Sequence, residues 1–135
     1  MKPITLAALG SVVLLCAGQA AAQTAIATEQ STLGRAAITL HLHPFLTEEE
    51  LVTLRLVATN EQALSLFVLG TAGYAALAVS PEDGFVRDGA LVASAVARAD
   101  LPDAQAASKA AQADCDAVRR GPTPCVVVLE VAPAP

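Results

Sequence analysis

The chain has 135 residues, of which 54% are hydrophobic, 16% are charged and only 3% are aromatic. This length suits one ordinary domain, and the hydrophobic content excludes a disordered acidic chain. Because 13 acidic residues outnumber 8 basic ones, the composition argues against nucleic acid and anionic membranes as partners.

The first 22 residues have the features of a cleavable signal peptide. Lys2 supplies a positive start, and residues 4–17 form an almost wholly apolar stretch. That stretch has the length of a secretory core and is too short to span a bilayer. Ala20 and Ala22 place small residues where signal peptidase accepts them, so cleavage is predicted after Ala22.

Two alternatives to this leader stay open. One is a retained N-terminal anchor, and the other is lipoprotein processing at Cys16, where Leu15 stands in place of the small residue required. No second apolar run of membrane length follows, so no membrane insertion is expected after cleavage. We therefore expect a periplasmic or secreted protein with a flexible lead over 23–35, a single domain over 36–132 and a tail over 133–135.

Residues 36–43 predict a half-buried strand, because apolar and polar residues alternate up to Pro44. In such a strand His41 and His43 point to the same side, so both imidazoles could bind one metal ion. The third ligand of a zinc or copper site would be Glu48, Glu49 or Glu50. The alternative is that both histidines belong to the solvated, polar side of the strand.

Local signals predict a helix over 48–59. Thr47 and Glu50 have the spacing of a capping box. Leu46 and Leu51 have the spacing of a hydrophobic staple, and the helix dipole favours the three glutamates of the first turn.

The middle of the chain predicts a β-hairpin. Two apolar runs over 63–69 and 74–80 flank a stretch with two glycines. A second turn is predicted over 80–84, and residues 85–97 are compatible with either a strand or an irregular loop.

A second helix is predicted from Asp100, as its N-cap, to about Arg120, because Gly121 and Pro122 end it. Its inner stripe consists of small residues, so the helix must approach its support closely. The stripe comprises Ala104, Ala107, Ala111, Cys115 and Val118.

Cysteine spacing predicts one disulfide. Signal cleavage removes Cys16 and leaves Cys115 and Cys125, an even number in an oxidising compartment. The alternatives are metal ligation, for which the intervening stretch offers only Asp116, and a redox pair, which usually has C-x-x-C spacing.

A last strand is predicted over 124–131, with Cys125, Val127 and Leu129 on one face. If the cysteines pair, that face must lie beneath the second helix, because the two Cα atoms are then only about 4.4–6.8 Å apart. Together the elements predict a small two-layer α+β domain with about four mainly antiparallel strands, two helices and one disulfide.

Four stretches of the sequence resemble small secreted alphaproteobacterial proteins of unknown function. The stretches are LVATNEQAL (56–64), GYAALAVSPEDGF (73–85), ADC (113–115) and PCVVV (124–128). The resemblance covers about residues 51–133. Because those proteins have no assigned active site, it implies no functional residue in this chain.

Some chains of that kind are called 5-aminolevulinate synthase (aminolevulic acid synthase) by name transfer. That enzyme holds pyridoxal phosphate through a lysine Schiff base. The only lysine after the predicted leader is Lys109, on the outer side of the second helix, and no glycine-rich phosphate cup is present. The sequence therefore does not support the activity that the name implies, and no cofactor is expected.

Other catalytic motifs are also missing from the sequence. It has no G-x-S-x-G elbow, P-loop or dinucleotide fingerprint. Glu82, Asp83 and Asp88 cluster near two glycines, but Phe85 and Arg87 stand where a calcium loop needs oxygen ligands. We expect a non-enzymatic exported accessory domain that binds an envelope protein; the alternatives are a metal-binding protein that uses His41 and His43, and a hydrolase with an unrecognised site.

Overall fold

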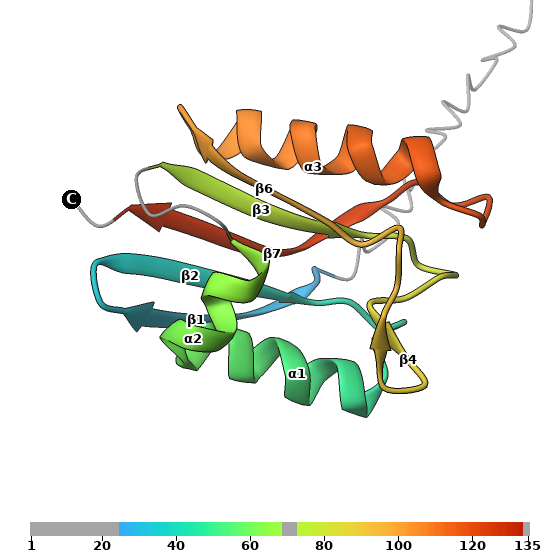
Figure 1. The fold of residues 1–135 in the computed structure, drawn as a ribbon, viewed down its shortest axis with the longest axis horizontal. Helices are drawn as coiled ribbons and strands as arrows, with labels where there is room; N and C mark the ends of the chain where they lie inside the picture. Colours follow the sequence, from blue (N-terminus) through green and yellow to red (C-terminus); the bar gives the residue numbers. More distant parts are fainter. Residues whose placement is uncertain (1–24, 69–72, 134–135) are drawn as a thin grey trace, which may run out of the picture.

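The computed structural model describes residues 25–68 and 73–133, which form a five-stranded antiparallel sheet, a two-stranded ribbon and three helices (Figure 1). The small α+β class is confirmed. In chain order the elements are β1 (Ala27–Leu33), β2 (Ala36–Leu42), α1 (Glu48–Thr59), α2 (Glu61–Phe67), β3 (Tyr74–Val79), β4 (Val86–Arg87), β5 (Ala90–Leu91), β6 (Val96–Leu101), α3 (Ala104–Val118) and β7 (Val126–Pro133).

The main sheet has the strand order β1-β2-β7-β3-β6, and helices cover both of its faces (Figure 1). Helix α3 packs on β3, β6 and β7, whereas α1 packs on β1 and β2. Along β3, Ala76 and Ala78 belong to the core beneath α3, and Leu77 and Val79 belong to the core beneath α1. The described domain thus has three layers rather than the predicted two. The sequence did not indicate the third layer, because β3 is apolar on both sides and so shows no alternation of apolar and polar residues.

Helix α1 confirms the predicted range 48–59. Both hydrogen bonds of the capping box form: Thr47 N–H donates to Glu50 Oε1 (3.0 Å), and Glu50 N–H donates to Thr47 Oγ1 (3.2 Å). Leu54 and Ala58 are buried on the side of the helix that faces the sheet. The helix was predictable because its start depends on residues within four positions of one another.

The prediction of a flexible lead over 23–35 is wrong for most of that range, because residues 27–33 form strand β1. Residues 27–33 pair with β2 in a continuous antiparallel register, joined by the two-residue turn Gly34-Arg35. Gly34 has φ +59°, which a Gly-X hairpin turn requires at its first position. The sequence does not predict this strand, because its residues are mostly polar. Backbone pairing with β2 stabilises it, and no apolar stripe is needed. The predicted leader, residues 23 and 24 and residues 134 and 135 of the tail lie outside the described residues.

The predicted hairpin is wrong in its first strand, because that stretch forms helix α2. Residues 61–67 are helical, with Asn60 as the N-cap accepting a hydrogen bond from Ala63 N–H (2.9 Å). The apolar residues of this stretch also suit a short strand, and the N-cap residue Asn60 is the local signal that distinguishes the helix. The strand over 74–79 is confirmed, but it pairs with β6 and β7. Residues 69–72, which include most of the predicted turn, lie outside the described residues.

The stretch over 85–97 contains a short ribbon. β4 and β5 pair across Asp88 and Gly89, whose φ values of 54° and 74° suit the two central positions of a tight hairpin turn.

Helix α3 starts three residues later than predicted. Its N-cap is Asp103, whose carboxylate accepts from Ala106 N–H (2.7 Å), whereas Asp100 ends up in β6 with φ +60°. Pro102 disfavours helical backbone in the residue before it, so the helix begins beyond the proline. Of the predicted inner stripe, Ala107, Ala111 and Cys115 are fully buried, whereas the two end residues are exposed.

An irregularity in β7 separates residues that the sequence placed on one face. Leu77 pairs with Leu129, but the next residue, Ala78, pairs with Val127, so Val128 is an extra residue in β7. Such a bulge reverses the side to which later residues point. Cys125 and Val127 lie beneath α3 as predicted, whereas Leu129 joins the core beneath α1.

Candidate functional site

A polar cluster lies on the face of the sheet that α3 partly covers. His41 Nε2 is 2.8 Å from Glu130 Oε2, and Ser108 of α3 donates to Glu130 Oε1 (3.0 Å). The cluster is half-buried, because the side chains of His41 and Glu130 are 27% and 33% exposed. The serine donates to a carboxylate rather than to an imidazole, so the arrangement differs from the Ser–His pair that activates a nucleophile.

His43 lies one residue beyond the end of β2, rather than within the strand as predicted, and it has its own partners. Its Nε2 is hydrogen-bonded to Val127 O (2.9 Å), and its ring stacks on Phe45 with centroids 5.5 Å apart. The two histidine rings lie 6.4 Å apart, centroid to centroid. Each imidazole is therefore oriented by a separate contact within the fold.

The structure does not bring the expected third ligand to the histidines. Glu48, Glu49 and Glu50 start α1, which packs on the opposite face of the sheet, and Glu50 is fully buried there. Residues 25–68 and 73–133 hold no group of three or more His, Cys, Asp or Glu side chains placed to share an ion. Metal binding by His41 and His43 stays a prediction.

Sequence reasoning missed Glu130 and Ser108 as partners of His41. Glu130 is the single charged residue in the strand VVVLEVAP. A charge inside an apolar strand indicates a partner across the sheet or above it, because burial without one is costly. The positions of those partners depend on β7 lying beside β2, which no local pattern in either strand reveals.

Glu50 is a charged residue that is fully buried on the sheet face covered by α1, opposite the face that α3 covers. Its Oε2 accepts hydrogen bonds from Phe85 N–H and Val86 N–H (3.0 Å for the latter), and Arg87 Nη2 lies 3.8 Å from Oε1. Burial raises the pKa of Glu50, but these N–H groups, Thr47 N–H and Arg87 outweigh it and hold the pKa below its ordinary value. Glu50 thus ties the start of α1 to the chain that enters β4.

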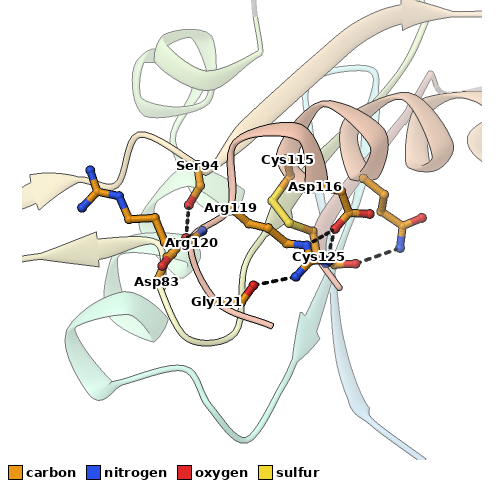
Figure 2. Close-up of a disulfide and its surroundings, with 9 residues drawn as sticks. Asp83, Ser94, Cys115, Asp116, Arg119, Arg120, Gly121 and Cys125 are labelled. Atoms are coloured by element: carbon orange, nitrogen blue, oxygen red, sulfur yellow. Dashed lines mark hydrogen bonds and ion pairs between the residues drawn. A yellow bond between two sulfur atoms is a disulfide. The ribbon is translucent and has the colours of Figure 1, made fainter. Parts of the chain in front are cut away.

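The disulfide joins the end of α3 to the start of β7 and confirms the predicted pairing (Figure 2). The Cα atoms of Cys115 and Cys125 are 6.1 Å apart, and both residues are buried. Cys125 N–H donates to Asp116 Oδ1 (2.8 Å), and Arg119 Nε lies 3.0 Å from the same oxygen. Asp116, weighed above as a metal ligand, therefore closes the loop instead.

Glu82 and Asp83 hold the loop that the disulfide closes. Asp83 Oδ2 accepts from Arg120 N–H (2.9 Å) and from Ser94 Oγ (3.0 Å), and these hydrogen bonds lower the pKa of Asp83 (Figure 2). Glu82 accepts from the hydroxyl and N–H of Thr123, and these bonds lower the pKa of Glu82. Both carboxylates thus serve the connection between α3 and β7.

One open cleft of about 500 Å³ lies between the β1–β2 turn, α2 and the end of β7. Leu64 and Val131 give it apolar walls, and Arg35 and Glu61 supply its charges. Residues 69–72 and 134–135, which adjoin it in the chain, lie outside the described residues. We assign no ligand to this cleft.

Large apolar side chains are exposed on the first two helices. Val52 and Leu56 of α1 are 60% and 54% exposed, and Leu66 of α2 is 77% exposed. Val52 and Leu56 are four residues apart, so they are neighbours on one helix face. The open face over β1 and β2 carries Thr, Gln and His side chains instead, so the outer sides of these two helices are more apolar than that face.

Comparisons of the chain with protein-family models, with curated proteins and with solved structures found no match.

Proposed function

We propose that the chain is an exported accessory domain without catalytic activity that acts by binding a protein of the cell envelope. The observation that carries the proposal is the exposure of Val52, Leu56 and Leu66 on α1 and α2. Val52 and Leu56 are neighbours on one helix face, and adjacent exposed apolar side chains are typical of interaction sites. The disulfide supports export, because such bonds persist in oxidising compartments.

Other features agree with this proposal. None of the helices in the described part of the chain has the length and apolar character needed to cross a bilayer. The charged side chains mostly serve the fold: Arg55 pairs with Glu29, Arg98 pairs with Asp114, and Glu50 holds backbone N–H groups. We place the partner on the outer side of α1, where no such internal contact occupies Val52 and Leu56.

Site-specific photo-crosslinking in the native envelope tests the proposal. With the crosslinker at Val52, we expect one adduct of defined mass, and the further substitution Leu56→Asp should abolish it without lowering the unfolding midpoint. The same crosslinker at Gln105, an exposed residue of α3, is the matched control and should give no such adduct. Equal products at both positions, or an adduct that survives Leu56→Asp, would contradict the proposal.

A further inference from the structure

The two edges of the main sheet are built differently. The edge strand β6 has an irregular register with β3, a positive φ of 60° at Asp100, and Arg98 paired with Asp114. Irregularity and charge are the devices by which proteins prevent an edge strand from pairing with another chain. The edge at β6 is therefore protected.

The opposite edge, β1, lacks these devices. Its sequence ATEQSTL contains no proline, glycine or lysine, and it pairs with β2 over seven successive residues without a register shift. Its one charge, Glu29, is neutralised by Arg55, whose Nη2 lies 2.7 Å from Glu29 Oε1. Within residues 25–68 and 73–133, no strand covers the outer side of β1. This edge can therefore accept another strand.

The hairpin geometry shows which backbone groups face outward. A two-residue turn makes its flanking residues, Leu33 and Ala36, a hydrogen-bonded pair, and such pairs then alternate along the ladder. The N–H and C=O groups of Thr28, Gln30 and Thr32 consequently point away from β2. These are the groups that an added strand would bind.

The three residues with outward-facing backbone groups, Thr28, Gln30 and Thr32, suit pairing with the same residues of a second copy. A two-fold axis at Gln30 would place Thr28 opposite Thr32 of a second copy, and Gln30 opposite its own equivalent. Cross-strand threonine pairs are favourable, and no like charges meet in this register. Shifting the axis to Glu29 would put two carboxylates opposite each other. Shifting the axis to Ser31 would leave Thr28 opposite Gly34 of the turn, so only the register at Gln30 pairs all three outward residues without opposing charges.

We propose that β1 binds β1 of a second copy of this chain, antiparallel about a two-fold axis at Gln30, and so joins two five-stranded sheets into one. The interface is isologous, as in most homodimers. Because acidic residues outnumber basic ones in each chain, added salt should strengthen the pairing. This inference uses a different surface from the partner site on α1 and stands independently of it.

Sedimentation velocity on the purified exported chain tests the pairing. We expect a dimer that forms with rising concentration and strengthens with salt. Gln30→Lys and Gln30→Glu should each raise the dimer dissociation constant about tenfold or more, because like charges then face each other at the axis. Mixing the two variants should restore the dimer as a heterodimer.

Ala37→Lys is the matched control. Ala37 is an exposed residue of β2, opposite Thr32 on the same face but one strand away from the edge. This variant gains the same charge as Gln30→Lys and should leave the dimer intact. A monomer at every concentration, a dimer unaffected by both Gln30 variants, or a mixture that fails to recover would each overturn the proposal.

Discussion

Cys115→Ser is expected to lower the free energy of unfolding by about 2–3 kcal/mol and the unfolding midpoint by about 10 °C. The disulfide closes a loop with a sequence separation of 10 residues and joins α3 to β7. Helix α3 packs through Ala107 and Ala111, which bury little apolar area per residue. The covalent bond therefore supplies much of what keeps this helix on the sheet.

Thermal unfolding followed by circular dichroism, with and without a reducing agent, measures this effect. The reductant should lower the midpoint of the wild type and leave Cys115→Ser unchanged. Cys115→Ser/Cys125→Ser is the control and should melt close to the single variant, because neither protein has the bond. A wild type that melts identically in both conditions would show that the disulfide contributes nothing.

Glu50→Gln should destabilise the domain by about 3 kcal/mol at neutral pH. The carboxylate is fully buried and accepts from Thr47 N–H on one oxygen and from Phe85 and Val86 N–H on the other. A glutamine amide has only one accepting oxygen, so its NH₂ group must face a backbone donor. The expected loss is therefore that of a buried donor left unsatisfied together with a weakened contact to Arg87.

Glu49→Gln is the matched control for this effect. Glu49 lies in the same helical turn but is exposed, so its substitution should change the unfolding free energy by no more than about 0.5 kcal/mol. Urea unfolding of the three proteins gives the comparison directly. Equal stabilities of the two variants would refute the role assigned to Glu50.

The effect of Glu50→Gln should also depend on pH. The pKa of Glu50 lies below its ordinary value of 4.5 in the folded protein, so the charged group stabilises the fold above that pH. This contribution disappears as the pH falls through the folded-state pKa. The difference in stability between wild type and Glu50→Gln should therefore be full at pH 7 and shrink below pH 4.5. Glu29, Glu82 and Asp83, whose pKa values are also lowered, are present in both proteins and largely cancel.

The parts of the fold that the sequence predicts well are those set by neighbouring residues. The capping box at Thr47, the small inner stripe around Ala107 and the pairing of two cysteines each depend on short spacings. The structure confirms all three. Local hydrogen bonds and helix periodicity decide these features before the chain makes any distant contact.

The features that the sequence concealed depend on contacts between distant segments. β1 is stable as a strand because β2 pairs with it, although its sequence is polar. The bulge at Val128 turns Leu129 to the other core, and a strict period of two cannot anticipate an extra residue. His41 meets Glu130 only because β7 inserts between β2 and β3. The composition of the candidate site thus follows from sheet order.

Intact-mass and N-terminal analysis of the protein recovered from the periplasm tests the central claim, that the chain is an exported domain closed by one disulfide. We predict a chain that starts at Gln23 and has a mass lower by two hydrogen atoms than its dithiol form. Thiol labelling without reductant should then find no free cysteine. A protein that retains Met1 and its leader, or one with two free thiols at Cys115 and Cys125, would contradict the account.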